Sequence, residues 1–375
     1  MINWKKQALG DLLQYTQPSH FIVNNTEYDS EFQTPVLTPG KSFILGYTNE
    51  QEGIYDRLPT IIFDDFTTAF KYVDFPFKVK SSAMKMLNTT SIKFDIKFIY
   101  YLMQTINFEA KEHKRYWISK YSQLQVRIPP LEEQKKIAAI LDAADDYRQK
   151  TKALIDKYDQ LTQSIFLDMF GDPVTNPKGW EKQPLNSICT KISVGFVGTC
   201  EPYYCSKEDG VAMLRTGNLG EGYLRLSNLK YVTYDFHDKQ KKSQLTAGDL
   251  LIARHGDNGK AVLYNGEFNQ ANCLNIVILR PSNRLKSLYV QFLLNNENTR
   301  KMMAGRTGGA TQKVINTKEI QKLEVTVPPI NFQNQFAERV AQIEKQKQQA
   351  EASLVKAEEL FSSLLQRAFK GELTS

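Results

Sequence analysis

The chain has few of the features on which metal sites, disulfides and membrane spans depend. Its 375 residues include four cysteines and four histidines, and neither a CxxC pair nor a metal-ligand spacing links them. We therefore expect no metal site and a reducing, cytoplasmic compartment. No apolar run approaches the roughly 18 residues that a membrane-spanning helix requires. The first residues also lack the apolar core of a signal peptide, so we expect neither a membrane span nor secretion.

Catalytic motifs are missing as well. The sequence contains no HExxH, no GxSxG, and no cofactor loop paired with the Pro-Pro-aromatic motif of DNA amino-methyltransferases. The glycine-rich segments 254–260 and 306–313 lack the GxxxxGK[ST] spacing of a phosphate loop. Asp64 and Asp65 follow a predicted strand without a third acid and a lysine at nuclease spacing, so we interpret them as a turn. We predict a binding protein without catalytic residues, and a self-contained DNA enzyme stays open as an alternative.

The sequence does contain a long internal repeat. Ile128-Pro129-Pro130 is followed by Gln134, and Val327-Pro328-Pro329, at an offset of 199 residues, is followed in the same way by Gln333. Each proline pair precedes a long helical pattern. A repeat of this length is too long for a solenoid unit and indicates two globular domains, each followed by one long helix. We predict globular domains at residues 1–127 and 173–326, and helical segments at residues 128–172 and 327–375.

Both helical segments have the spacing of a coiled coil. Apolar residues recur in alternating steps of four and three along residues 131–170 and 331–371, and Gly171 and Gly371 follow as expected of C-terminal caps. We predict that the two helices pair with each other; packing of each helix on its own globule is the alternative. If the pair is antiparallel, the two globules lie at its opposite ends. The length of each helix, about 60 Å, would then set the distance between the two globules. The predicted seam consists of Ile140, Ala144, Tyr147, Leu154, Tyr158, Leu161 and Ile165 in the first helix and Phe336, Val340, Ile343, Leu354, Phe361 and Leu364 in the second.

The two globules share an order of predicted elements but differ in their residues. Short β-rich runs at 60–63, 75–79 and 84–87 precede a helix at 96–103; runs at 249–254, 260–264 and 274–279 precede a helix at 287–295. The net charge is +7, from 48 Lys and Arg against 41 Asp and Glu, and the two helices together sum to −1. The basic excess therefore lies in the globules and their flanks, as expected of proteins that bind a polyanion.

This organisation resembles the specificity (S) subunits of type I restriction-modification systems. Residues 128–139 (IPPLEEQKKIAA) are similar to that family's junction into its first spacer helix, and residues 327–337 (VPPINFQNQFA) are a second copy. Residues 250–260 (LLIARHGDNGK) and 308–312 (GGATQ) resemble stretches of its recognition domains, and Gly179-Trp180 resembles the start of one. In the first globule, residues 60–67 (TIIFDDFT) replace the Arg- and Gly-rich stretch.

The resemblance implies an α+β fold with two target recognition domains joined by two long antiparallel coiled-coil spacer helices. It implies a non-catalytic subunit that reads a bipartite, asymmetric site in double-stranded DNA. The spacer helices would dock two methyltransferase (M) subunits, and restriction (R) subunits would join them. S-adenosylmethionine, ATP and magnesium would belong to those partners, so no cofactor is expected in this chain.

Side chains suited to base edges and phosphates are the candidate DNA contacts. They are Arg254, His255, Lys260, Arg306, Gln312 and Lys313 in the second domain, and Lys71, Lys78, Lys80, Lys85 and Arg115 in the first. Two further readings of the chain stay open besides the DNA enzyme. One is a coiled-coil scaffold without a DNA role, and the other is the specificity module of another multi-subunit modification or phage-defence system.

Overall fold

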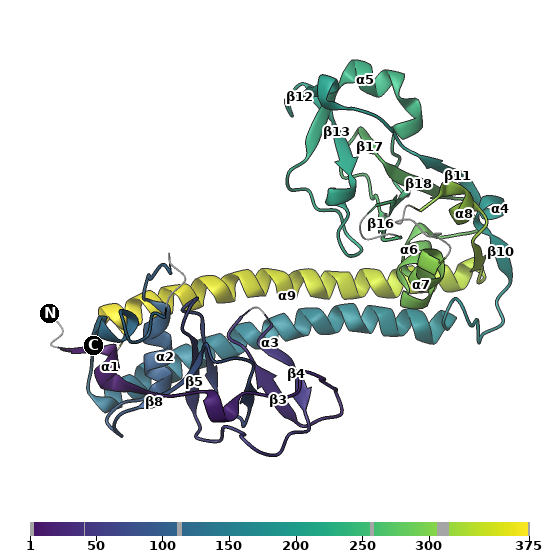
Figure 1. Cartoon of the computed structure of the whole chain (residues 1–375). Coiled ribbons are helices and arrows are strands. Elements are labelled where there is room, and N and C mark those ends of the chain that lie inside the picture. Colours follow the sequence, from purple (N-terminus) through teal and green to yellow (C-terminus); the bar gives the residue numbers. More distant parts are fainter. Residues whose placement is uncertain (1–3, 41, 111–114, 256–258, 306–314, 374–375) are drawn as a thin grey trace. The chain divides into compact units, whose positions relative to one another are not determined.

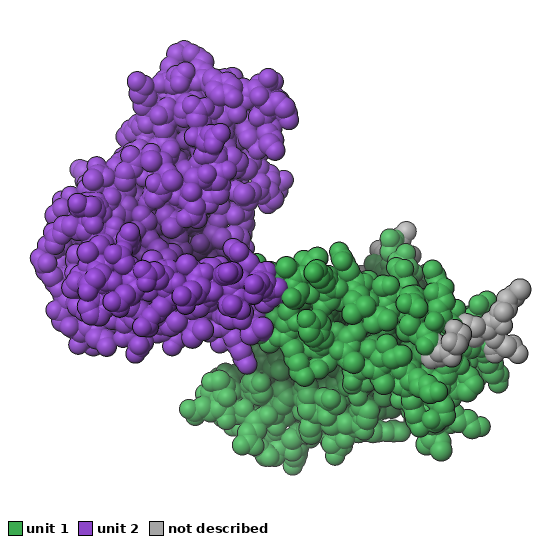
Figure 2. Space-filling view, turned by 180° about the vertical axis from the view of Figure 1, so that it is seen from behind, with its two compact units in different colours: residues 1–153, 351–375 green, residues 154–350 purple. Residues whose placement is uncertain are grey.

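The computed structural model describes residues 4–40, 42–110, 115–255, 259–305 and 315–373 (Figure 1). The chain forms two compact units, residues 1–153 with 351–375 and residues 154–350 (Figure 2). Each unit therefore contains one globule, one half of the first long helix and one half of the second. The units divide the chain in the middle of both helices, whereas the sequence suggested divisions at the helix ends.

The two long helices are α3 (Leu131–Phe170) and α9 (Ile330–Lys370). Their bounds agree with the predicted ranges to within a residue. Each helix ends at a glycine in the left-handed region, Gly171 with φ of 76° and Gly371 with φ of 78°. Glycine reaches this conformation without the steric penalty that a side chain would impose, so the predicted caps are confirmed.

The first globule has two sheets and a short ribbon. One sheet has the antiparallel order β2-β8-β5-β6, the other has the order β4-β3-β7 with β3 and β7 parallel, and the ribbon pairs β1 with β9 immediately before α3. Its elements are β1 (Lys5–Ala8), α1 (Leu9–Leu12), β2 (Leu13–Thr16), η1 (Ser19–Phe21), β3 (Thr34–Leu37), β4 (Ile44–Thr48), β5 (Thr60–Asp64), β6 (Phe70–Val73), β7 (Lys78–Val79), β8 (Met84–Thr89), α2 (Ile96–Gln104), η2 (Tyr121–Gln123) and β9 (Gln125–Ile128).

The second globule repeats this plan. Its sheets have the orders β11-β18-β15-β16 and β12-β14-β13-β17, and its ribbon pairs β10 with β19 before α9. Its elements are β10 (Lys182–Pro184), α4 (Leu185–Ile188), β11 (Cys189–Val194), η3 (Glu201–Tyr203), β12 (Tyr204–Cys205), β13 (Gly210–Arg215), η4 (Thr216–Asn218), β14 (Lys230–Thr233), α5 (Tyr234–Lys239), η5 (Lys241–Ser243), β15 (Leu250–Ala253), β16 (Ala261–Leu263), β17 (Ala271–Leu274), β18 (Ile276–Pro281), α6 (Ser287–Asn295), α7 (Glu297–Gly305), α8 (Thr317–Gln321) and β19 (Glu324–Thr326).

The correspondence confirms that the globules share one scaffold. β2, β8, β5 and β6 match β11, β18, β15 and β16 in order, and α2 matches α6, both with nine residues. The second globule adds the edge strand β12 to its other sheet. One predicted strand was too long: of residues 75–79, only Lys78–Val79 pair as a strand. Pro76 lies within that run and has no N–H to give to a ladder.

In each unit, the core joins the globule to both long helices. In unit 1, Phe98 and Tyr101 of α2 belong to one cluster with Leu141 of α3 and Phe361 of α9. In unit 2, Tyr289 of α6 belongs to one cluster with Phe166 and Phe170 of α3 and Phe336 of α9. The pairing of the helices and the packing of each helix on a globule, posed as alternatives, therefore occur together.

Contacts between the helices run in the antiparallel sense within each unit. In unit 1, Arg148 lies 4.3 Å from the ring centroid of Phe361, and Lys152 pairs with Glu358. In unit 2, Lys347 pairs with Asp159, and the rings of Phe166 and Phe336 lie 5.7 Å apart. As the residue number rises along α3, it falls along α9, as predicted.

None of the helices in the described part of the chain is long and apolar enough to cross a membrane.

The predicted seam residues of α9 are all buried or half-buried. Phe336, Val340 and Phe361 are buried, and Ile343, Leu354 and Leu364 are half-buried. Three alanines at the same alternating spacing of four and three residues, Ala350, Ala357 and Ala368, are buried as well. Small side chains at these positions permit close approach of the neighbouring helix.

Four of the seven predicted seam residues of α3 are not at buried positions. Ala144, Tyr158 and Ile165 are half-buried as expected. The other four apolar residues are substantially exposed: Ile140 by 38%, Tyr147 by 54%, Leu154 by 43% and Leu161 by 45%.

The positions buried in their place lie one residue further along and are partly polar: Leu141 and Thr162 are buried, and Arg148 and Ile155 are half-buried. Thr151, which lies on the predicted stepping between Ala144 and Tyr158, is buried as well. The two threonine hydroxyls donate to carbonyls of the preceding turn, those of Tyr147 at 2.8 Å and Tyr158 at 2.9 Å. A polar group hydrogen-bonded in this way is buried at little cost, and apolar spacing alone does not reveal it.

Candidate nucleic-acid interface

The basic segment of the second domain begins where β15 ends. Arg254 is half-buried, its Nε donates to the carbonyl of Ile315 at 3.4 Å, and its own carbonyl accepts from the N–H of Ile315 at 3.2 Å. His255, the next residue, is exposed. These contacts hold Arg254 at the end of β15, where the residue is half-buried.

Lys260, at the other end of this segment, is buried and paired. Its ammonium lies 2.6 Å from a carboxylate oxygen of Glu221, whose side chain is 68% exposed, while the lysine side chain is 4% exposed. The second oxygen of Glu221 lies 3.9 Å from the guanidinium of Arg300 on α7. In this structure Lys260 therefore faces a carboxylate rather than open solvent.

The remaining candidates of the second domain cannot be placed. Arg306, Gln312 and Lys313 lie outside the described residues, together with the GGATQ stretch at 308–312. Their role in DNA contact stays a prediction.

Three candidates of the first domain are exposed. Lys71 lies on β6, Lys80 follows β7 and Arg115 precedes η2. The ammonium of Lys80 lies 5.8 Å from the ring centroid of Tyr28. All three side chains are available to a ligand without rearrangement of the core.

Lys78 and Lys85 are core residues, so we withdraw them as DNA contacts. The Lys78 ammonium pairs with Glu50 at 3.0 Å and donates to the carbonyl of Glu52 at 2.6 Å. The Lys85 ammonium pairs with Asp65 at 3.2 Å, and both side chains are at most 2% exposed. A buried ammonium requires a nearby acid because leaving it unpaired in the core would cost several kcal/mol.

Asp64 and Asp65 form the turn that the sequence suggested. One oxygen of Asp64 accepts from the N–H groups of Phe66 at 2.9 Å and Thr67 at 2.8 Å. Asp65, besides pairing with Lys85, accepts from the N–H of Trp117 at 2.8 Å. This turn lies at the end of β5, and Arg254 and His255 directly follow the matching strand β15. The same place in the shared scaffold thus carries a buried, ion-paired acid in one domain and partly exposed basic residues in the other.

Sequence reasoning missed a short hairpin at residues 219–226, between β13 and β14. The N–H of Gly220 donates to the carbonyl of Tyr223 at 2.7 Å, and Leu219 bridges Leu224. Tyr223 is 57% exposed, and Arg225 is also exposed. The loop between β13 and β14 covers residues 216–229, whereas the loop between the matching β3 and β4 covers only 38–43. Gly220 and Gly222, on either side of Glu221, are the sequence feature that could have indicated this turn.

The described residues offer no metal site and no reactive thiol. No group of three or more His, Cys, Asp or Glu among them could hold a metal ion. Burial raises the pKa of the Cys273 thiol to about 12, and that of Cys189 to about 12. A thiol in this state is a poor nucleophile and a poor ligand, so both cysteines pack as small apolar residues.

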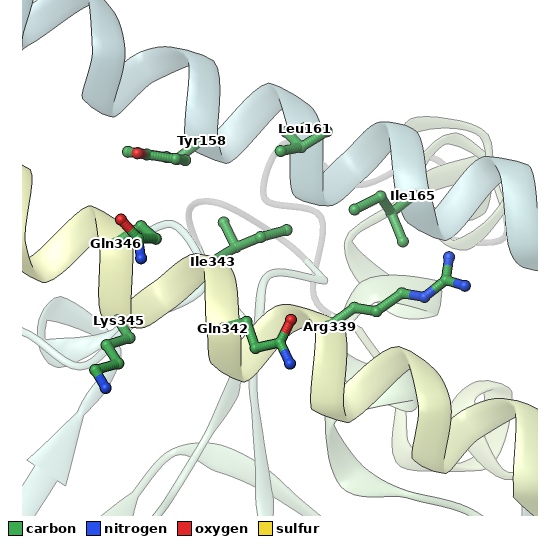
Figure 3. A pocket seen from close by; sticks show the side chains of 8 residues that line it. All are labelled: Tyr158, Leu161, Ile165, Arg339, Gln342, Ile343, Lys345 and Gln346. Atoms are coloured by element: carbon green, nitrogen blue, oxygen red, sulfur yellow. The ribbon is translucent and has the colours of Figure 1, made fainter.

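A groove of about 580 Å³ lies between the two long helices in unit 2 (Figure 3). Tyr158, Leu161 and Ile165 of α3 face Ile343 and Gln346 of α9 across it. Three longer polar side chains complete the lining, Arg339, Gln342 and Lys345. The lining therefore combines apolar, amide and cationic groups.

Comparison with known proteins identifies the family. Residues 1–158 and 177–356 match the family described as Type I restriction modification DNA specificity domain. The Escherichia coli EcoR124I/EcoR124II specificity subunit is 43% identical over 166 residues, a match that covers 43% of this chain but only 39% of that protein. The MjaVIII specificity subunit of Methanocaldococcus jannaschii is 21% identical over 376 residues and covers 91% of this chain and 86% of its own length.

A solved structure has the same fold. The S subunit of a type I restriction-modification system from M. genitalium superposes with a TM-score of 0.59 at 15% identity, over 98% of this chain and 96% of that one. The family match extends over both globules and most of both helices, and the architecture agrees with it. This chain therefore belongs to the type I restriction modification DNA specificity domain family and carries the domain twice.

Proposed function

We propose that this chain is the sequence-specific DNA-recognition subunit of a type I restriction-modification complex, and that it reads a bipartite, asymmetric site. One observation carries this proposal beyond family membership. Two globules with the same strand order differ where β5 and β15 end: Asp65 is buried and paired with Lys85 in the first, whereas Arg254 is half-buried and His255 is exposed in the second. A duplicated scaffold with unlike surfaces suits two unlike half-sites.

The exposed basic residues are the proposed DNA contacts. In the second domain, Arg254 can form the paired hydrogen bonds that guanine offers in the major groove, and His255 lies beside it. In the first domain, Lys71, Lys80 and Arg115 can contact phosphates, which position the protein without reading sequence. Arg306, Gln312 and Lys313 complete the proposed set in the second domain.

The long helices are the proposed docking surface for two methyltransferase subunits, which restriction subunits would join. The four exposed apolar residues of α3 support this proposal, because Ile140, Tyr147, Leu154 and Leu161 recur every seven residues along the helix. An apolar stripe of this spacing suits a partner helix. The chemistry, and with it S-adenosylmethionine, ATP and magnesium, would reside in the partners.

The double variant Arg254→Ala/His255→Ala tests the assignment of the half-sites. In the assembled complex, we expect methylation to become tolerant of base changes in one half-site and to stay strict in the other. Lys239→Ala is the matched control, because Lys239 is an exposed cation of the same domain that pairs with Asp235 on its own helix. Unchanged specificity in the double variant would mean that these residues do not read DNA.

A further inference from the structure

Three lysines are buried within the described part of the chain, and one of them differs from the others in its counter-ion. Lys78 and Lys85 pair with Glu50 and Asp65, whose side chains are 17% and 2% exposed. Lys260 pairs with Glu221, whose side chain is 68% exposed. The Lys260 ammonium is therefore buried, but one of its partners, the Glu221 carboxylate, lies at the surface.

Glu221 bridges two cations with its two oxygens. One oxygen lies 2.6 Å from the Lys260 ammonium, and the other lies 3.9 Å from the Arg300 guanidinium. A DNA phosphate likewise carries one negative charge and offers two unesterified oxygens to Lys and Arg. In charge and acceptor number, the carboxylate occupies the place that a backbone phosphate would fill.

The backbone around Glu221 allows this carboxylate to leave. Gly220 and Gly222 flank it at the tip of hairpin 219–226, and Gly222 has φ of 79°. The carbonyl of Gly222 accepts from the Gln291 side chain at 3.2 Å, which anchors the hairpin beside the tip. The carboxylate can therefore swing away while the base of the hairpin stays in place, since glycine neighbours impose few steric limits. Because the Lys260 ammonium is buried, leaving it unpaired would be costly, so the carboxylate leaves only when another anion takes its place.

We propose that Lys260 and Arg300 form a binding site for a DNA backbone phosphate, and that Glu221 fills this site in the unbound protein. The inference rests on the proposed DNA-recognition function and deepens it. On random DNA, Glu221 stays on the two cations and lowers the attraction of the second domain for phosphate. On the recognised sequence, the additional contacts compensate for displacing it. Glu221 is thus a specificity-determining residue that acts against weak, unspecific binding.

The test compares Glu221→Gln with Glu208→Gln in the full chain bound to its methyltransferase subunit. Glu208 is an exposed acid of the same domain, so both variants lose the same charge. Binding is measured by fluorescence anisotropy on a labelled duplex that lacks the methylated motif, across a series of salt concentrations. For Glu221→Gln we expect about threefold to tenfold tighter binding at about 0.1 M salt. We also expect a salt dependence of log K steeper by about 0.9 to 1.8, the value for one or two added phosphate contacts.

A second variant separates the site from a general charge effect. Adding Arg300→Gln to Glu221→Gln should return the unspecific affinity most of the way to that of the unmodified protein. Equal behaviour of Glu221→Gln and Glu208→Gln would overturn the inference while leaving the proposed function intact, provided that the unmodified complex still selects its motif. Failure of the unmodified complex to bind DNA would overturn both.

Discussion

Gln134 and Gln333 make the same three hydrogen bonds, one in each unit. Gln134 accepts from the N–H of Asp95 at 2.9 Å and donates to the carbonyls of Pro129 at 2.9 Å and Lys93 at 3.3 Å. Gln333 accepts from the N–H of Lys286 at 2.8 Å and donates to the carbonyls of Pro328 at 2.8 Å and Arg284 at 3.1 Å. Each glutamine thereby ties the first turn of a long helix to the loop that leads into α2 or α6.

This network explains why the proline pair and the glutamine recur together. The prolines end the strand before the helix and have no N–H to give, and their carbonyls are left to accept from the glutamine and from the first helical turn. Both glutamines are almost completely buried. The repeat is therefore a junction that fixes the direction in which each helix leaves its ribbon.

Replacing either glutamine should weaken its own unit. We expect Gln134→Ala and Gln333→Ala each to lower the free energy of unfolding of the affected unit by about 2 to 3 kcal/mol, because buried partners lose their hydrogen bonds. Hydrogen exchange measured by mass spectrometry should show faster exchange around residues 93–95 in the first variant and around 284–286 in the second. Gln349→Ala, at an exposed position of α9, is the control and should leave both regions unchanged. Loss of protection in neither region would refute the proposed junction.

Two adjacent residues of α3 distinguish the observed seam from the predicted one. Leu141 is completely buried, and Ile140 is 38% exposed. We expect Leu141→Ala to destabilise unit 1 by about 2 to 5 kcal/mol and Ile140→Ala by less than about 1 kcal/mol. Chemical denaturation of the purified chain measures both. Equal losses, or a larger loss for Ile140→Ala, would favour the seam expected from apolar spacing.

Lys85 and Lys71 should separate stability from DNA binding. Replacing Lys85 with Met leaves Asp65 as an uncompensated buried charge, which should cost about 3 to 5 kcal/mol. Lys71→Ala removes an exposed cation and should leave the melting temperature within about a degree, while it weakens binding of all DNA sequences alike. Thermal unfolding and DNA titration of the two variants provide the comparison. A fully stable Lys85→Met protein with weaker DNA binding would restore Lys85 as a contact.

Glu50 should make unit 1 sensitive to acid. Burial alone would raise the pKa of this carboxyl, but hydrogen bonds from the Asn25 N–H, the Lys78 ammonium and the Asn24 N–H, with the charge of Lys78, hold the pKa below its usual value. A lowered pKa in the folded state adds stability above the ordinary carboxyl pKa, and that stability disappears as the pH falls through the folded value. Glu50→Gln should therefore flatten the dependence of unfolding free energy on pH below about 4.5, relative to the unmodified chain. An unchanged slope would contradict the assigned role.

The parts of the fold that follow from local pattern could be predicted from the sequence. The proline pairs, the apolar stepping of α9 and the glycine caps each act within a few residues of chain. The helix expected at 287–295 is α6 with the same bounds. These features depend on hydrogen bonds and steric limits between residues that are close in sequence, so the residue types and their spacing predict them.

The parts that failed depend on residues distant in sequence. Lys78 and Lys85 look like surface lysines until the fold brings Glu50 and Asp65 beside them. The seam of α3 includes Arg148, which becomes an inner position because the Phe361 ring lies against its guanidinium. Hydrophobicity along one helix cannot show what the opposite helix offers, so Ile140, Tyr147, Leu154 and Leu161 were each assigned one residue before the buried position. Glu221 was missed for the same reason, since its partners lie on other elements.

The central claim is tested most directly by methylation mapping. The chain would be expressed with its methyltransferase subunit in a host that lacks both, and methylated adenines would be located by single-molecule sequencing. The account predicts a single new motif made of two unlike short half-sites with a fixed unspecified gap, absent when this chain is omitted. A stable complex that methylates nothing new, or that methylates the same motif without this chain, would contradict it.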